Sequence, residues 1–228
     1  MQATIAECPF CAGLEQAVLC DLAGTASIRE VDAQRFIFHE HEPATTFYIL
    51  MHGQALLSKL ADTGQQVIIR AVKPLDAIGV IASLSQTVYP LSARAILPCT
   101  LLAWDHSTLT GLMDRHPVLA LRALRLLAGR FADLQHQYLE LATQRVERRI
   151  AHTLLRLMQQ VGQPVTAGTL VDLPLSRQQL AEMSGTTLYT ASRVLSRWAQ
   201  QGIVVSAREQ VIICDPHRMM QIADSPPA

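Results

Sequence analysis

The feature that most constrains the fold is a long apolar stripe that follows Pro117. Residues 118–144 place apolar side chains at steps of three and four, which is the period of an α-helix, and proline suits the first turn of such a helix. A helix of about 25 residues is ~38 Å long and outspans a small domain. A second copy of the helix is the natural partner for the stripe. The alternative is one long helix packed on its own sheet.

If a second copy covers the stripe, this helix is a dimerisation helix. We then expect its contacts to come from apolar residues spaced along one side of it. These residues are Leu119, Ala123, Leu127, Leu134, Tyr138 and Leu141.

The segment before this helix has the pattern of a β-protein. Short apolar stretches recur between residues 28 and 104, and turn residues such as His52-Gly53 and Lys73-Pro74 separate them. Many short strands at near-regular spacing predict an antiparallel sandwich or barrel. The expected strands are Phe36–Phe38, Thr46–Leu50, Ala55–Leu60, Gln66–Val72, Ala93–Ala95 and Thr100–Trp104. Helices are expected over residues 9–25 and from Ser107.

Helical periodicity continues after the long helix. Val146–Gln160 predicts an amphipathic helix with Ile150, Leu154, Leu155 and Met158 facing inward, and residues 161–171 predict a loop or strand. Residues 225–228 are expected to fray. The chain therefore divides into an α+β arrangement of three parts, residues 1–115, 116–143 and 144–228.

The most informative stretch is residues 173–205. Ser176 and Gln179 have the spacing of a capping box, and Gly185 suits the end of the short helix that this box begins. Thr186 and Thr187 can cap a second helix that runs through Arg197. The inward face of the second helix consists of Ala191, Val194, Leu195 and Trp198. Helix, short turn with glycine and helix is the helix-turn-helix geometry; the alternative is an ordinary helical hairpin with solvated polar residues.

The outward residues suit DNA contact. A major groove admits one helix, and an arginine such as Arg193 can pair bidentately with guanine. Hydroxyls and backbone N–H groups near helix starts can contact phosphates. The candidate DNA-binding residues are Ser176, Arg177, Thr187, Tyr189, Thr190, Ser192, Arg193 and Arg197. Residues 202–214 then predict two strands around residues 207–210, the wing of a winged helix.

Charge supports this placement although the formal net charge is +0. Residues 1–143 carry 10 basic and 13 acidic groups, whereas residues 144–228 carry 9 basic and 6 acidic groups. The net charges of −3 and +3 cancel, and the basic part holds the helix-turn-helix. A basic region attracts phosphates.

Over about residues 9–220 the chain resembles the CRP/FNR family of bacterial transcription regulators. SRQQLAEMSGTTLYTASRVLSRW is similar to the family's winged helix-turn-helix, and GTTLYTASR is most similar to its nitrogen-oxide-responsive (NnrR-like) branch. RVERRIAHTLLRLM, FYILMHGQALL and AIGVIASL resemble further family segments. The resemblance implies a cyclic-nucleotide-binding-type β-roll as sensor domain, a central dimerisation helix and a C-terminal winged helix-turn-helix. It also implies a homodimer on palindromic double-stranded DNA and contact with RNA polymerase, and leaves activation or repression open.

Two departures from the family's cyclic-AMP binders concern the ligand. Gly79-Val80 stands where those proteins have a Gly-Glu pair, and Tyr89-Pro90 stands where they have an Arg-Ser pair. The ribose and phosphate partners are thus missing, and a nucleotide phosphate left without its partner is costly to bury. We therefore expect a signal other than cyclic AMP, such as nitric oxide, oxygen or redox state. In the second helix of the helix-turn-helix, Tyr189 replaces the family's usual Glu, so the half-site is expected to differ.

The cysteines offer one sensor hypothesis. Cys8, Cys11 and Cys20 resemble the clustered N-terminal cysteines of the family's oxygen-sensing branch, which hold an iron–sulfur cluster of four thiolates. Cys99 is the candidate fourth ligand, although the family's own position falls near Leu102. We favour the alternative of inert thiols, with Cys11 and Cys20 at positions of the first helix that suit a core.

Haem is the other cofactor that the nitrogen-oxide branch implies, and haem needs an axial ligand such as His. No spacing among the eight histidines singles one out, and His136 on the long helix is the one we single out for a test. The alternative function is a cupin-like metal-binding protein or enzyme with a vestigial DNA-binding domain, using His39 and His41. A ligand-sensing module without DNA binding is a third hypothesis. We expect no enzyme, because no P-loop, GxSxG or HExxH motif is present.

The remaining expectations concern location. Half of the residues are hydrophobic, which argues against disorder, and Arg122 and Arg125 interrupt the longest apolar helix, which argues against a membrane span. The first residues show no secretory signal. We expect a cytoplasmic protein with reduced thiols and no membrane partner.

Overall fold

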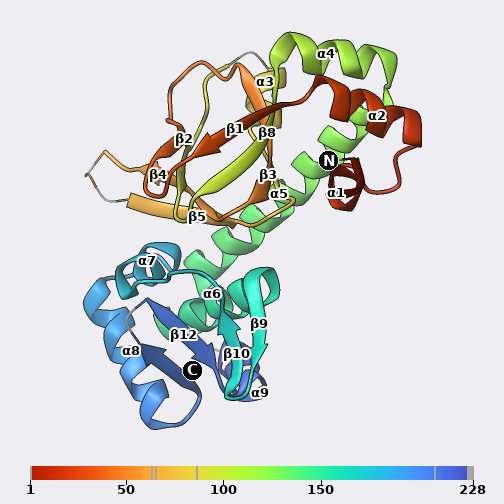
Figure 1. The fold of residues 1–228 in the computed structure, drawn as a ribbon. Coiled ribbons are helices and arrows are strands. Elements are labelled where there is room, and N and C mark those ends of the chain that lie inside the picture. The colour runs from red at the N-terminus through yellow and green to blue at the C-terminus, as the bar shows by residue number, and fades with distance from the viewer. Residues whose placement is uncertain (1, 63, 65, 86, 208, 225–228) are drawn as a thin grey trace. The chain divides into compact units, whose positions relative to one another are not determined.

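The computed structural model describes residues 2–62, 64, 66–85, 87–207 and 209–224. The chain folds into two compact units, formed by residues 1–59 with 70–134 and by residues 60–69 with 135–228 (Figure 1). The helix α5 (Val118–Thr143) contributes residues to both units. The predicted fraying of residues 225–228 lies outside the described residues.

The strands of the N-terminal half form two antiparallel sheets, as the spacing predicted. Within the described residues the strand orders are β1-β8-β3-β6 and β2-β7-β4-β5. Every predicted strand is present within one or two residues of its expected bounds. The strands are β1 Ser27–Val31, β2 Phe36–Phe38, β3 Thr46–His52, β4 Ala55–Leu60, β5 Gln66–Val72, β6 Ala77–Ile78, β7 Ser92–Ala95 and β8 Cys99–Asp105.

Strand β3 explains why this sheet needs cover on both sides. Its residues 47–51 are all buried. Alternate side chains of a strand point to opposite faces, so burial of consecutive residues means that both faces are covered. Phe47 and Ile49 join a core cluster that includes residues of α2, whereas Tyr48 and Leu50 join the cluster between the sheets. Full burial of such a side chain contributes about 1.5–3 kcal/mol. The uninterrupted apolar run is therefore a strand with two covered faces.

Helices flank this β-roll: α1 Gln2–Glu7, α2 Gln16–Thr25, α3 Val80–Leu84 and α4 His106–Arg115. The predicted helix over residues 9–25 is wrong in its first half, because residues 9–13 form turns and the helix begins only at Gln16. Pro9 lacks a backbone donor and Gly13 has φ +73°, and both features interrupt a helix. Helix α4 begins as expected, because the Asp105 carboxylate accepts from Thr108 N at 2.8 Å.

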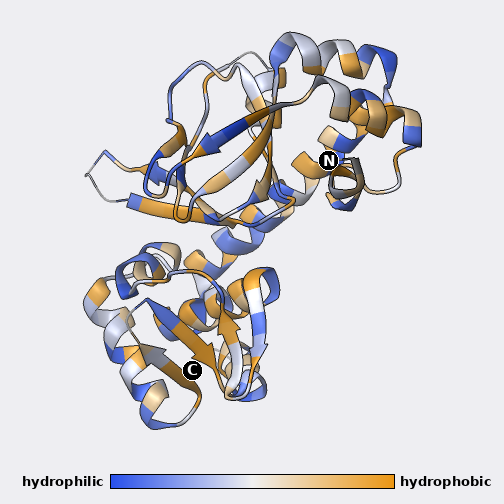
Figure 2. Ribbon diagram, in the orientation of Figure 1, coloured by the Kyte–Doolittle hydropathy of each residue, from blue (hydrophilic) through white to orange (hydrophobic). Residues whose placement is uncertain are grey.

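Helix α5 confirms the predicted long helix, with 26 residues. Its hydrophobic and hydrophilic segments alternate along its length (Figure 2). Leu119 and Ala123, expected as dimer contacts, are instead buried in the core that α5 shares with α2 and β8. Their side chains pack within the protomer, because the first turns of α5 close this core. The other four expected residues are exposed: Leu127, Leu134, Tyr138 and Leu141.

The C-terminal unit is built on α6 Val146–Val161, which follows the prediction except that Leu157 is buried where Leu155 and Met158 are half-buried. Residues 162–171 form a hairpin that joins the predicted wing in one sheet, with strand order β11-β12-β10-β9. The remaining elements are β9 Gly162–Val165, β10 Gly168–Val171, α7 Arg177–Met183, α8 Leu188–Gln200, β11 Val204–Ala207, β12 Gln210–Ile213 and α9 Pro216–Asp224.

Helix α9 was not predicted. The Asp215 carboxylate accepts from Arg218 N at 2.9 Å, and Pro216 is the first helical residue. Aspartate followed by proline is an ordinary start signal for a helix, so the sequence carried the information. No helix of the described chain is long and apolar enough to span a bilayer.

Candidate DNA-binding site

The capping box predicted at Ser176 is present and begins α7. Ser176 Oγ accepts from Gln179 N at 3.1 Å, and Gln179 Oε1 accepts from Ser176 N at 2.8 Å. The turn after α7 includes Gly185 with φ +60°, a conformation that favours glycine. Thr187 then caps α8, because its hydroxyl accepts from Thr190 N at 3.3 Å. Helix, turn and helix therefore lie where the sequence placed them.

Helix α8 buries the predicted face completely: Ala191, Val194, Leu195 and Trp198 are each at most 5% exposed. Trp198 also donates its indole N–H to Glu147 Oε1 at 3.1 Å, which ties α8 to α6. One face of α8 is thus committed to the domain core, and only the opposite face is free to meet another molecule.

The outward face carries the candidate contacts. Tyr189 is 75% exposed, and the Arg193 guanidinium lies 6.0 Å from the centre of its ring. This distance is at the limit of a cation–π contact. Arg177 and Thr187 are exposed, while Ser176, Thr190 and Ser192 are half-buried. Seven of the eight predicted residues are therefore at least partly accessible, at the start of α7 or along α8.

Arg197 differs from the other seven. Its guanidinium pairs with Glu147 Oε1, the same oxygen that accepts from Trp198. The charge is therefore balanced inside the domain, at the end of α8 away from its N-terminus. The structure gives Arg197 a role in holding α8 on α6, which sequence spacing did not predict.

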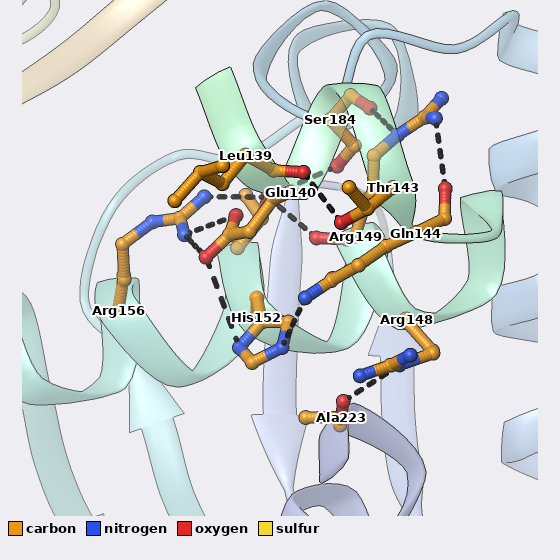
Figure 3. Close-up of polar contacts among 11 residues, drawn as sticks. Leu139, Glu140, Thr143, Gln144, Arg148, Arg149, His152, Arg156, Ser184 and Ala223 are labelled. Carbon is orange, nitrogen blue, oxygen red and sulfur yellow. Dashed lines mark hydrogen bonds and ion pairs between the residues drawn. The ribbon is translucent and has the colours of Figure 1, made fainter. Parts of the chain in front are cut away.

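The sequence reasoning missed Arg149, which secures the turn of the helix-turn-helix. From α6, Arg149 Nε donates to Ser184 O at 3.0 Å and Nη2 donates to Gly185 O at 2.9 Å. Nη1 donates to Gln144 O at 3.3 Å, at the junction of α5 and α6 (Figure 3). The basic run in RVERRIAH is visible in the sequence. Its backbone acceptors, however, lie 35 and 36 residues along the chain, and no sequence pattern predicts that pairing.

A second cluster of polar side chains joins the end of α5 to α6. Arg156 Nη1 lies 2.7 Å from both carboxylate oxygens of Glu140, and His152 contacts Glu140 and Gln144 at 3.9 and 3.3 Å (Figure 3). Arg148 donates to Ala223 O in α9 at 2.9 Å. Three arginines of α6 thus contact the three other helices: Arg156 contacts α5, Arg149 the end of α7 and Arg148 α9.

In the β-roll, the two departures from the nucleotide binders lie together. The Tyr89 ring stacks on Phe38, with 3.9 Å between centroids, and its hydroxyl donates to Thr46 O at 2.7 Å. A Cβ added to Gly79 would lie 3.2 Å from the Tyr89 ring. Burial raises the pKa of Tyr89 to about 12. A buried neutral ring therefore stands at the position where the resemblance would place a phosphate-binding arginine.

The structure does not bring the four candidate cysteines together. Cys8 and Cys11 lie in the core cluster beside α2, Cys99 lies in the cluster between the sheets, and Cys20 is exposed rather than in the core position expected for it. Cys11 precedes α2 instead of lying in it. This arrangement favours the inert-thiol interpretation over the four-thiolate iron–sulfur hypothesis, since such a cluster needs its ligands around one centre.

The structure does not group the candidate histidines into a metal site within its described residues either. His39 and His41 flank Glu40 in a loop, and His41 lies 3.5 Å from that carboxylate. Within the described parts of the chain, no three His, Cys, Asp or Glu side chains are grouped as a metal site requires. His136 is exposed on α5. The cupin-like alternative therefore lacks its further ligands.

Comparison with known proteins agrees with this arrangement. The family model of the cyclic nucleotide-binding domain matches residues 28–116, and that of the Crp-like helix-turn-helix domain matches residues 148–222. The nitrogen fixation regulation protein FixK of Bradyrhizobium diazoefficiens is 24% identical over 225 residues, which cover 95% of this chain and 93% of FixK. A CRP-like cAMP-activated global transcriptional regulator of Mycobacterium tuberculosis is 24% identical over 213 residues, 92% of this chain and 94% of its own.

Among solved structures, FixK2 from Bradyrhizobium japonicum matches with a TM-score of 0.77 and 26% identity, over 89% of this chain and 99% of that chain. A β-roll followed by a long helix and a winged helix-turn-helix defines a DNA-binding transcription regulator. The chain belongs to the CRP/FNR family of these regulators.

Proposed function

We propose that the protein acts as a homodimer in which α8 of each protomer reads one half of a palindromic DNA site. The observation that carries the proposal is the division of α8 into a fully buried face and an outward face with Tyr189 and Arg193. Two-fold symmetry in a protein matches two-fold symmetry in its DNA site. The residues near the two helix starts then contact phosphates, and Arg193 contacts base edges.

The stripe on α5 supports the dimer. Three heptads along the helix place large apolar side chains at both core positions of a coiled coil, and each is 42–71% exposed in the protomer. The first core position is taken by Leu124, Phe131 and Tyr138, and the second by Leu127, Leu134 and Leu141. An apolar face of this size on a monomer marks an interaction site.

For the sensor domain we propose a signal other than cyclic AMP, namely nitric oxide, oxygen or redox state, as in the nitrogen-oxide-responsive branch. Tyr89 supports the exclusion, because its buried ring offers no positive charge to a phosphate. An absorption spectrum of anaerobically purified protein separates haem, with its Soret band, from an iron–sulfur centre and from a colourless protein. We further propose that the dimer works in the cytoplasm and contacts RNA polymerase.

Fluorescence anisotropy tests the DNA proposal, with a duplex that holds a palindrome from the protein's own promoter neighbourhood. We expect two protomers per duplex, and Arg193→Ala to weaken binding by ~1–3 kcal/mol. Arg218→Ala on α9 is the matched control, because it removes an exposed arginine outside the helix-turn-helix. Full affinity of Arg193→Ala would overturn the assignment of α8, and one protomer per duplex would overturn the dimer.

A further inference from the structure

Cys8 and Cys11 lie at the two ends of one tight turn. Cys11 N donates to Cys8 O at 2.8 Å, which closes the four residues from Cys8 to Cys11 into a β-turn. The first and last Cα atoms of such a turn are less than ~7 Å apart. Disulfides span Cα separations of about 4.4–6.8 Å, so the backbone already holds these two cysteines within bonding reach.

The two thiols form a chemically unequal pair. They are hydrogen-bonded to each other, and Cys8 Sγ also donates to Leu75 O at 3.0 Å. The hydrogen bond from Cys11 lowers the pKa of Cys8, whereas the same bond and burial raise the pKa of Cys11. Cys8 is therefore the thiol that ionises more readily, at the loss of its bond to Leu75 O, while Cys11 retains its proton. A cysteine with a lowered pKa is the more reactive one of such a pair.

The turn is attached to the long helix. Arg122 of α5 donates to Ala12 O, one residue after Cys11. Leu119 and Ala123 of α5 lie in the same buried cluster as both cysteines. Because a packed core transmits small displacements, a change in the turn acts on the first turns of α5.

We propose that Cys8 and Cys11 are an oxidisable pair that closes to an intramolecular disulfide and thereby shifts the packing of the turn against α5. The oxidant is a hydroperoxide. The Cys8 thiol loses its proton, the thiolate attacks the terminal oxygen of the hydroperoxide, and the O–O bond breaks. Cys8 becomes a sulfenic acid, and the leaving alkoxide or hydroxide takes up the proton that the thiol released. Cys11 then attacks Cys8 Sγ, the S–S bond forms, the S–O bond breaks, and the Cys11 proton leaves with the hydroxyl as water.

The other described cysteines provide internal controls. Cys20 is exposed, and no residue beside it completes a CxxC pair. Cys99 is buried against the carbonyls of Gln54 and Leu97, and burial raises its pKa. The pair itself is fully buried, so oxidation requires local opening of the short α1 and the turn. We therefore expect the pair to react more slowly than the exposed Cys20, but to yield an intramolecular disulfide.

The test uses the full-length protein, reduced and then exposed to hydrogen peroxide, denatured and treated with iodoacetamide. Trypsin releases residues 1–29 as one peptide with Cys8, Cys11 and Cys20. We expect this peptide to lose two hydrogens and to carry its alkyl group at Cys20 alone. Cys20→Ser is expected to keep the disulfide, and Cys8→Ser and Cys11→Ser to lose it. A wild-type peptide with both Cys8 and Cys11 alkylated after peroxide would overturn the proposal, whatever the variants do.

A second readout tests the link to α5, and this arm alone rests on the proposed function. Oxidation is expected to change the affinity of the wild-type protein for its palindrome about fivefold or more, reversibly with dithiothreitol. The change should be absent in Cys8→Ser. Disulfide formation with unchanged affinity would overturn the link. If neither redox form binds DNA, the proposed function fails. The peptide experiment then still shows whether Cys8 and Cys11 form a disulfide.

Discussion

Arg149 Nη2 lies 2.9 Å from Gly185 O, and this contact joins the helix that follows α5 to the turn between α7 and α8. The neighbouring carbonyl of Ser184 accepts from Nε of the same guanidinium. The two carbonyls belong to the end of α7, where helix carbonyls lack partners within the helix. One planar side chain thus satisfies both carbonyls and ties α6 to the turn that leads into α8.

We predict that Arg149→Ala destabilises the protein by about 1–3 kcal/mol, because it leaves these acceptors without their donor. Arg149→Lys keeps the charge but lacks the planar fork, so it should recover only part of the loss. Urea unfolding followed by circular dichroism measures the change, with Arg218→Ala as the control that leaves stability unchanged. Equal stability of Arg149→Ala and the wild type would show that the carbonyls find other partners.

Tyr189 is expected to set part of the half-site preference. It is 75% exposed on the outward face of α8, where the family's usual Glu accepts from cytosine N4. We predict that Tyr189→Glu moves the preference at one base pair of each half-site toward cytosine, by ~1–3 kcal/mol. Binding to a panel of duplexes that differ at single positions measures the shift. An unchanged ranking of the duplexes would place Tyr189 outside the base-reading set.

The exposed heptads of α5 predict the effect of a charge in the dimer interface. Leu134→Glu should shift the protein from dimer toward monomer, because a carboxylate facing its own copy is both desolvated and repelled. Sedimentation over a range of concentrations measures the assembly. The matched control is Ala132→Glu, which adds the same charge at an exposed position of α5 outside both core positions of the heptad. If both variants sediment as dimers, the stripe is not the interface.

The sequence predicted those parts of the site that depend on local pattern. The capping box at Ser176 and the buried face of α8 follow from neighbours within four residues, and both are confirmed. The parts it missed depend on contacts between distant segments. Leu119 continues the apolar stripe of α5, but only the fold shows that the core beside α2 takes it. Arg149 likewise finds its acceptors 35 and 36 residues along the chain.

Tyr89 predicts how stability depends on pH. Its pKa in the folded protein is raised to about 12 by burial, against ~10 in the unfolded chain. The unfolded state therefore loses its proton first, so the stabilisation is complete below pH ~10 and is lost as the pH rises through about 12. Tyr89→Phe should flatten this decline relative to the wild type, because the other tyrosines remain the same in both proteins. Tyr89→Phe should also lower the free energy of unfolding at pH 8 by about 1–3 kcal/mol, since Thr46 O and N lose their hydroxyl partner.

Urea unfolding of both proteins between pH 8 and pH 11.5 measures both effects. Parallel curves would mean that burial does not raise the pKa of Tyr89 in the folded protein.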